Sequence, residues 1–188
     1  DHGGIGAKLL PEGDRHGILI LGAPHLEDLG ELLLHGAMRV DTYPDGWTAD
    51  EATSFRLLDE FVDAGFNLVD TADVYSMWVE GNRGGESETI IGNWLAKGGK
   101  RHRVLVATKV GFHGKGEGKL TREHILRSCD ESLKRLRTDY IDLYQLHAIP
   151  YPATMAAVMD CLAQLKRQGK IRHYGVSNET AWGVCEFA

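Results

Sequence analysis

Acidic, phenolic, basic and imidazole side chains follow the apolar segments of this sequence at regular intervals. In chain order they are Asp70, Tyr75, Lys109 and His147, and the pair Ser177-Asn178 follows the last apolar segment. A phenol beside a cation is a good proton donor, because the positive charge stabilises the phenolate and lowers a pKa that is otherwise about 10. Such a donor suits the reduction of a carbonyl group by hydride transfer, in which the new alkoxide must take up a proton.

Each of these side chains has an expected part in that chemistry. Tyr75 would donate the proton, and the Lys109 ammonium would lower the pKa of the Tyr75 hydroxyl. Asp70 would keep Lys109 charged and oriented, while His147 would hydrogen-bond the substrate oxygen. Taken singly, every one of them has an ordinary structural explanation, such as a turn, a solvated strand end or a packing contact. The hypothesis therefore depends on their occurring together at successive segment ends.

Strands and helices that could position these groups alternate along the chain. Four short apolar segments are predicted strands: 67–70, 103–109, 140–146 and 172–176. Segments with helical spacing of apolar residues are predicted helices: 48–64, 86–97, 121–136 and 153–168. Thr48 with Glu51 has the spacing of a capping box, and Thr121 is a second expected N-cap. This alternation implies parallel strands joined by right-handed crossovers.

Doubly wound sheets and barrels both have such strands. The dinucleotide-binding pattern GxGxxG is missing: Gly114, Gly116 and Gly118 come close, but no helix is predicted to start there. The phosphate-binding pattern GxxxxGK[ST] is also missing from the sequence. We therefore predict an α/β fold of the parallel (β/α) TIM-barrel type, in which functional groups gather at the C-terminal ends of the strands.

Composition excludes several other classes of protein. The 188 residues are 43% hydrophobic, which is enough for a sizeable core, and the net charge of −6 argues against a nucleic-acid partner. No apolar run approaches the roughly 18 residues of a membrane span. Cys129, Cys161 and Cys185 are far apart, and the nine histidines lack metal-ligand spacing, so no metal site is expected. An odd number of scattered cysteines without a visible secretory signal favours the cytoplasm.

Four blocks of the sequence resemble the aldo-keto reductases in their order and spacing. They are NLVDTADVY at 67–75, VATK at 106–109, DYIDLYQLH at 139–147 and GKIR…GVSN at 169–178. The resemblance covers roughly residues 46–188. It implies an eight-stranded (β/α) barrel that binds a nicotinamide dinucleotide, usually NADPH, without a separate dinucleotide-binding domain.

The resemblance also implies a role for each matched residue. Tyr75 is the proton donor, Lys109 lowers its pKa, Asp70 pairs with Lys109, and His147 orients the carbonyl. Ser177 and Asn178 would hold the nicotinamide carboxamide, with Asp70 near the nicotinamide ribose. Trp78 would line the substrate pocket, although packing in the core or a lid explains it equally well.

Two features depart from the family pattern. Residues 1–45 lack a convincing Leu-Gly-x-Gly-Thr segment, the nearest text being Leu21-Gly22-Ala23, so we expect a divergent N-terminal segment of unclear role before a barrel portion at 46–188. Counted in family blocks, the chain stops in the helix after the fifth strand, which predicts a barrel incomplete at its C-terminal end. Open sheet edges in such a fold favour pairing of copies into a homo-oligomer.

Three functional hypotheses follow. The leading one is an NADPH-dependent oxidoreductase that reduces small aldehydes or ketones to alcohols. The second is a catalytically inactive aldo-keto reductase-like fragment, or a regulatory or binding subunit, that keeps the residues but works through partners. The third is an aldolase-type barrel with Lys109 as a Schiff-base nucleophile. The identity of the carbonyl substrate is left open by all three.

Overall fold

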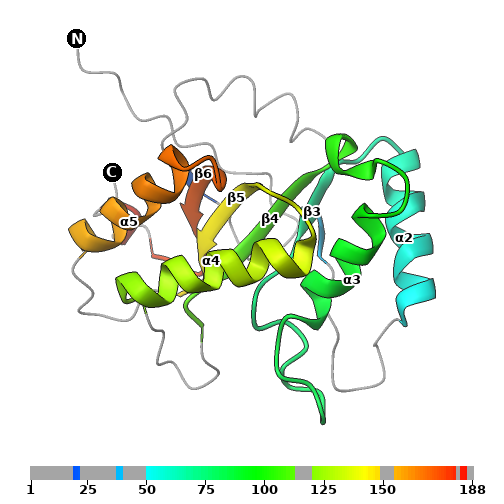
Figure 1. Cartoon of the computed structure of the whole chain (residues 1–188), viewed down its shortest axis with the longest axis horizontal. Coiled ribbons are helices and arrows are strands. Elements are labelled where there is room, and N and C mark those ends of the chain that lie inside the picture. The colour runs from blue at the N-terminus through cyan, green and yellow to red at the C-terminus, as the bar shows by residue number, and fades with distance from the viewer. Residues whose placement is uncertain are drawn as a thin grey trace.

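A six-stranded sheet organises the molecule (Figure 1). The computed structural model describes residues 50–112, 120–148, 155–180 and 183–185, together with the strand backbones at 19–21 and 37–39. The strands are β1 (Leu19–Leu21), β2 (Ala37–Arg39), β3 (Leu68–Asp70), β4 (Leu105–Val110), β5 (Ile141–Leu146) and β6 (Ile171–Val176). They run in the order β1-β6-β5-β4-β3-β2, and all pairs are parallel except the antiparallel pair of β1 with β6.

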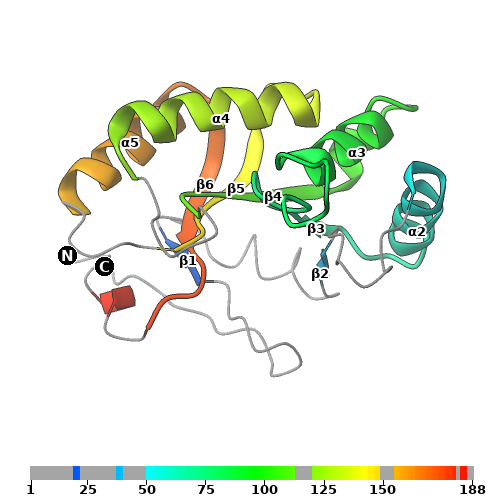
Figure 2. The ribbon, with the colours of Figure 1, turned by 90° about the horizontal axis from the view of Figure 1, so that it is seen from below.

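Helices alternate with the strands from β3 onward, as the sequence predicts. They are α2 (Glu51–Asp63), α3 (Glu86–Leu95), α4 (Arg122–Leu136) and α5 (Met155–Arg167), with a short 3-10 helix, η1 (Lys100–Arg103), before β4. Helices α3, α4 and α5 lie on one side of the sheet (Figure 2). The predicted parallel α/β class is therefore confirmed. The leucine-rich sequence at 26–34 could also form a helix, but it lies outside the described residues.

Two N-caps decide where helices begin. Thr121 caps α4 as predicted, since its hydroxyl accepts a hydrogen bond from His124 N at 3.3 Å. The capping box at Thr48 is wrong, because α2 begins two residues later with Asp50 as its N-cap. Asp50 Oδ1 accepts a hydrogen bond from Thr53 N at 2.7 Å. A carboxylate at this position also meets the positive end of the helix dipole.

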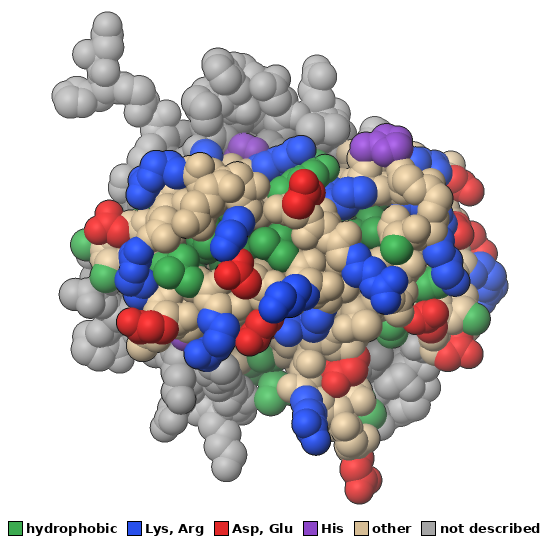
Figure 3. Space-filling model, in the orientation of Figure 1, with side chains coloured by type: hydrophobic (Ala, Val, Ile, Leu, Met, Phe, Trp, Pro, Cys, Tyr) green, Lys and Arg blue, Asp and Glu red, His purple; other side chains and the backbone are tan. Residues whose placement is uncertain are grey.

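A large apolar core fills the space between the sheet and the helices. Fully buried large side chains come from all four helices and from β5 and β6, among them Trp94, Tyr144, Leu58, Ile91, Ile125, Leu136, Leu162 and Ile171. Full burial of one such side chain stabilises the fold by about 1.5–3 kcal/mol. On the exposed helical face, basic and acidic side chains are interspersed (Figure 3), so this face presents no strong patch of one charge.

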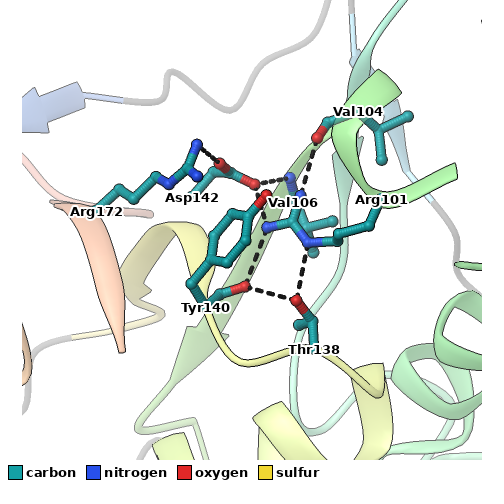
Figure 4. A network of polar contacts seen from close by, with 7 residues as sticks. All are labelled: Arg101, Val104, Val106, Thr138, Tyr140, Asp142 and Arg172. Carbon is teal, nitrogen blue, oxygen red and sulfur yellow. Dashed lines mark hydrogen bonds and ion pairs between the residues drawn. The ribbon is translucent and has the colours of Figure 1, made fainter. Parts of the chain in front are cut away.

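A polar network closes the end of the sheet where β4 and β5 begin (Figure 4). The buried Asp142 carboxylate accepts hydrogen bonds from Arg101 Nη2 at 2.5 Å, Val106 N at 2.9 Å and Arg172 Nη1 at 3.2 Å. Both guanidinium groups also lie against the Tyr140 ring, 3.8 and 3.9 Å from its centroid. The network thereby joins β4, β5 and β6. It also satisfies the Asp142 carboxylate, since a buried carboxylate is stable only where it is paired and hydrogen-bonded.

Helix α3 packs against the end of α4 with very little space between them. A Cβ atom added at Gly92 would lie 2.0 Å from the carbonyl oxygen of Arg135 and 2.8 Å from the carbonyl carbon of Leu136. Both atoms belong to the backbone, so they cannot move aside without shifting α4. Glycine at this position is therefore required by the close approach of two helices.

Asp73 lies in the loop between β3 and α3, close to this helix contact. Its backbone N donates to the Lys109 carbonyl at 3.2 Å, and a Cβ added at Gly84 would lie 2.9 Å from its carbonyl oxygen. Desolvation, together with the Glu88 carboxylate, raises the pKa of Asp73 to about 8, although Arg135 opposes the change. The Asp73 carboxyl is therefore mostly protonated at neutral pH.

Gly92→Ala should destabilise the protein, although alanine is the better helix former by about 1 kcal/mol. The added methyl group meets backbone atoms of α4, and overpacking of this kind costs roughly 1–3 kcal/mol. We expect a net loss of at least about 1 kcal/mol in the free energy of unfolding, measured by urea denaturation. A variant as stable as the wild type, or more stable, would contradict the packing described here.

Asp73→Asn should remove part of the pH dependence of stability. The pKa of Asp73 is about 8 in the folded protein, whereas the ordinary pKa of an Asp carboxyl is 3.8. Between these values unfolding releases a proton, so the free energy of unfolding falls as pH rises. From pH 6 to pH 8 the wild type should lose about 2 kcal/mol more than Asp73→Asn in urea denaturation.

The matched control for this measurement is Asp63→Asn, whose side chain is 72% exposed in a surface ion pair. It should keep the slope of the wild type. Equal slopes for the wild type and Asp73→Asn would show that the Asp73 carboxyl is not protonated in the folded protein.

Candidate active site

Strand pleating brings the predicted residues to one place. Side chains alternate between the two faces of each strand, so residues two apart share a face. On the face away from the helices, Leu68, Ala107 and Leu143 form a small apolar cluster. Two residues further along the same three strands, the side chains are polar: Asp70, Lys109 and Gln145.

The Lys109 ammonium lies at the centre of this polar group. Its Nζ atom donates to Asp70 Oδ2 at 2.5 Å, to the Thr71 carbonyl at 2.9 Å and to Tyr75 Oη at 3.1 Å. These three acceptors match the three N–H groups of an ammonium. Lys109, Asp70 and Tyr75 are all more than nine-tenths buried. The structure thus places three of the four predicted catalytic residues in direct contact.

His147 is beside Tyr75, at the end of β5. The centroids of the two rings are 5.8 Å apart, with an interplanar angle of 75°. The centroid of the His147 ring also lies 5.0 Å from that of Phe112, and the centroid of the partly exposed Trp78 ring lies 6.1 Å from that of Tyr75. Aromatic rings therefore surround the Tyr75 phenol and the imidazole, and the fourth predicted catalytic residue belongs to the same cluster.

Ser177 and Asn178 follow β6, next to the end of β5. Asn178 Nδ2 donates to the His147 carbonyl at 3.0 Å and to Ser177 Oγ at 3.2 Å. Asn178 has a left-handed backbone, with φ of 57°, which asparagine tolerates better than most residues. These contacts join the ends of β5 and β6, so two of the three predicted cofactor residues, Ser177 and Asn178, lie at the same edge of the sheet as His147.

Gln145 is a residue of this group that the sequence analysis missed. It is fully buried, pairs with Lys109 across β4 and β5, and donates from Nε2 to Asp70 Oδ1 at 3.2 Å. Its Oε1 atom has no hydrogen-bond partner among the residues that the structure describes. The sequence offered one sign of this role: Gln145 lies two residues before His147, so both side chains point to the same face of β5.

Ser76, directly after Tyr75, has an unusual backbone. Its φ angle is 76°, in the left-handed region that most residues other than glycine avoid. Its carbonyl accepts hydrogen bonds from Asn82 Nδ2 and Val79 N, both at 3.1 Å. Such strained residues are held by their surroundings and are concentrated at functional sites. The loop thereby fixes the backbone next to the phenol.

Other reactive groups in the described part of the chain do not form a site. No cluster of three His, Cys, Asp or Glu residues there could hold a metal ion. Burial raises the pKa of the Cys129 thiol to about 12, and that of Cys161 is also raised, so both thiols stay protonated. None of the described helices is both long and apolar enough to cross a membrane.

Comparison with known proteins agrees with this arrangement. The model of the aldo/keto reductase family matches residues 32–188, so it includes strand β2 and part of the N-terminal segment. The chain is 38% identical over 161 residues to protein tas of Escherichia coli, covering 73% of this chain and 46% of tas. It is 37% identical over 166 residues to an NADP(+) aryl-alcohol dehydrogenase of Phanerodontia chrysosporium, covering 79% and 41%.

Solved structures give the same result. An aldo-keto reductase of Klebsiella pneumoniae in complex with NADPH has a TM-score of 0.64 and 27% identity, covering 78% of this chain and 46% of that protein. The holo form of an aldo-keto reductase of Bacillus halodurans has a TM-score of 0.63 and 28% identity, covering 92% and 50%. The chain spans about half the length of the relatives it matches.

The part of the chain that matches the family model includes the residues that the structure brings together at the candidate site. The family model covers all of the strands that position Asp70, Tyr75, Lys109 and His147. The structural match extends over most of the described sheet and helices. This chain therefore belongs to the aldo/keto reductase family.

Proposed function

We propose that this protein is an NADP-dependent oxidoreductase that reduces the carbonyl group of a small aldehyde or ketone to an alcohol. The observation that supports this most directly is the Lys109 ammonium, which lies 2.5 Å from Asp70 Oδ2 and 3.1 Å from Tyr75 Oη. A phenol in this position is suited to donate the proton that the new alkoxide requires. Tyr75 is accordingly the proposed proton donor.

The buried ion pair prepares the phenol for proton transfer. Asp70 keeps the Lys109 side chain protonated, because a buried ammonium is stable only beside a negative charge. The ammonium in turn stabilises the phenolate that remains after Tyr75 has donated its proton. This stabilisation is stronger in a buried site than in water, because the surrounding medium screens the charges less.

His147 and the aromatic residues are proposed to orient the substrate. The imidazole lies beside the Tyr75 ring, so one carbonyl oxygen could accept hydrogen bonds from both groups. Two polarising donors would hold the carbonyl in place for reduction. Phe112 and the partly exposed Trp78 would then contact the apolar part of the substrate.

A nicotinamide cofactor fits the polar atoms at this edge of the sheet. Gln145 Oε1 is a buried acceptor without a partner among the described residues, next to Asp70. Ser177 and Asn178 would hold the carboxamide, and Asp70 would lie near the ribose, as the family resemblance implies. The bound cofactor supplies the hydride. The NADP(+) specificity and the NADPH complex of two relatives favour the phosphorylated form.

The aldolase alternative is disfavoured by the same ion pair. A Schiff-base lysine must lose its proton to become a nucleophile. Lys109 instead makes three hydrogen bonds as a donor, one of them to a carboxylate. A neutral amine has only two N–H groups, so attack on a carbonyl would require the loss of at least one of these contacts and of the charge that pairs with Asp70.

The proposal also covers the cellular location and the binding partners of the protein. We propose a cytoplasmic location, because all three cysteines are free thiols. The proposed partners are a small carbonyl compound and a second copy of the chain.

Tyr75→Phe should abolish carbonyl reduction while leaving cofactor binding largely intact. Loss of the phenolic proton donor should lower kcat by at least about 100-fold, the range typical of general acid catalysis. The affinity for NADPH, followed by nicotinamide fluorescence, should change by less than about threefold. Turnover is measured by NADPH absorbance with a panel of aromatic and aliphatic aldehydes.

Tyr140→Phe is the matched control, because its ring lies in the polar network at the opposite end of the sheet. It removes the same hydroxyl group and should leave turnover unchanged. Near wild-type turnover in Tyr75→Phe would rule out the proposed mechanism. A folded wild-type chain with neither turnover nor NADPH binding would instead favour the inactive-fragment hypothesis.

A further inference from the structure

Two threonine hydroxyl groups lie on the opposite side of β3 and β4 from the Lys109–Asp70 ion pair. Thr71 directly follows Asp70, and Thr108 directly precedes Lys109. Both threonines are fully buried and point toward α3. Because neighbouring side chains in a strand point to opposite faces, each threonine fixes the direction of the catalytic residue beside it.

Two consecutive residues at the start of α3 hold these hydroxyl groups. Ser87 Oγ lies 2.8 Å from Thr71 Oγ1, and Glu88 Oε1 accepts a hydrogen bond from Thr108 Oγ1 at 2.6 Å. One helical turn thereby contacts both strands that support the Lys109–Asp70 ion pair. No step of the proposed reaction uses Ser87 or Glu88 directly.

Glu88 is itself held firmly in place. It is fully buried, and its Oε2 atom accepts from Arg135 Nε at 2.6 Å. A Cβ added at Gly85 would lie 2.5 Å from Arg135 Cδ, so the arginine passes directly against the start of α3. A buried carboxylate costs stability unless it is paired, and here one oxygen meets a guanidinium and the other a hydroxyl.

Thr71, which Ser87 contacts through its hydroxyl group, also binds Lys109 through its backbone carbonyl. The Thr71 carbonyl is one of the three acceptors of the Lys109 ammonium, at 2.9 Å. Thr71 N in turn donates to the Ala107 carbonyl at 2.9 Å. Ser87 therefore holds Thr71, whose carbonyl is an acceptor for the Lys109 ammonium. Glu88 holds Thr108, the residue directly before Lys109.

We propose that Ser87 and Glu88 are positioning residues, which fix the Lys109 ammonium between Asp70 and Tyr75 through the hydroxyl groups of Thr71 and Thr108. The inference rests on the proposed role of Tyr75 as proton donor. Catalytic groups lose efficiency when they are misplaced by about 1 Å, and sites depend on supporting contacts of this kind. Loss of the Thr108–Glu88 hydrogen bond should let the end of β4 rotate and move Lys109 away from the phenol.

The experiment measures the pKa of the Tyr75 hydroxyl by NMR in the full chain labelled with ¹³Cζ-tyrosine. The Tyr75 resonance is assigned by its absence in Tyr75→Phe. Thr108→Val keeps the shape of the side chain and removes its hydroxyl group, and should raise the Tyr75 pKa by about 0.5–1 unit. With an aldehyde substrate, kcat should fall about tenfold with less than about a twofold change in KM.

Two further variants keep the test specific. Thr108→Ser retains the hydroxyl group and should restore the pKa and kcat toward wild-type values. Glu88→Gln replaces the carboxylate acceptor of the Thr108 hydroxyl by a weaker amide acceptor, and should shift the Tyr75 pKa in the same direction as Thr108→Val but by less. If Thr108→Val does not fold, Thr71→Val tests the same inference through Ser87.

The controls separate positioning from general destabilisation and from electrostatics. Asp142→Asn breaks an equally buried Arg–carboxylate contact at the other end of the sheet, so it should lower stability without moving the Tyr75 pKa. Asp73→Asn removes the other carboxyl near Glu88 and Arg135, which is ionised above about pH 8, so any electrostatic effect should lower the Tyr75 pKa, opposite to the shift expected for Thr108→Val.

Two results would overturn the inference. A lowered Tyr75 pKa in the wild type that stays the same in folded Thr108→Val and Glu88→Gln would contradict the positioning role alone. A wild-type Tyr75 pKa near the ordinary value of about 10 would contradict the proposed function as well, since Lys109 would then not act on the phenol.

Discussion

The burial of one ammonium group determines how the functional end of this protein is arranged. A charged Lys109 side chain can leave water only where acceptors replace its hydration. The ends of β3 and β4 and the following loop supply them in Asp70, the Thr71 carbonyl and the Tyr75 hydroxyl. Gln145 then binds the second carboxylate oxygen of Asp70. The same contacts that make the buried charge tolerable therefore place a phenol beside a cation.

Buried polar groups at the two ends of the sheet differ in how their hydrogen bonds are satisfied. At one end, Asp142 is fully engaged by two arginines and a backbone N–H, which is an arrangement suited to stability. At the other end, Gln145 Oε1 and Ser76 Oγ are buried without partners among the described residues, and Ser76 has a strained backbone. Unpaired polar atoms and strain are unfavourable for folding, so their position beside Tyr75 fits a site that binds a ligand.

Sequence patterns predicted the strand-end residues because pleating and strand alternation are local rules. Asp70, Lys109 and His147 were found from the apolar segments before them, and their convergence followed from parallel pairing. The Glu88–Arg135 contact joins residues 47 apart, and the Thr108–Glu88 contact residues 20 apart, so no local pattern predicts either. The start of α2 was misplaced because Thr48 and Asp50 are both good N-caps, and only the folded chain distinguishes them.

Isotope transfer would test the proposed chemistry at the reacting atoms. The chain is mixed with an aldehyde and with NADPH that carries deuterium at both hydrogen positions of the nicotinamide C4, and the alcohol product is analysed by mass spectrometry. If the Tyr75–Lys109–Asp70 arrangement supports carbonyl reduction, deuterium should appear on the former carbonyl carbon, and the alcohol proton should come from solvent. A folded chain that binds NADPH but yields no labelled alcohol with any aldehyde or ketone tested would contradict the account.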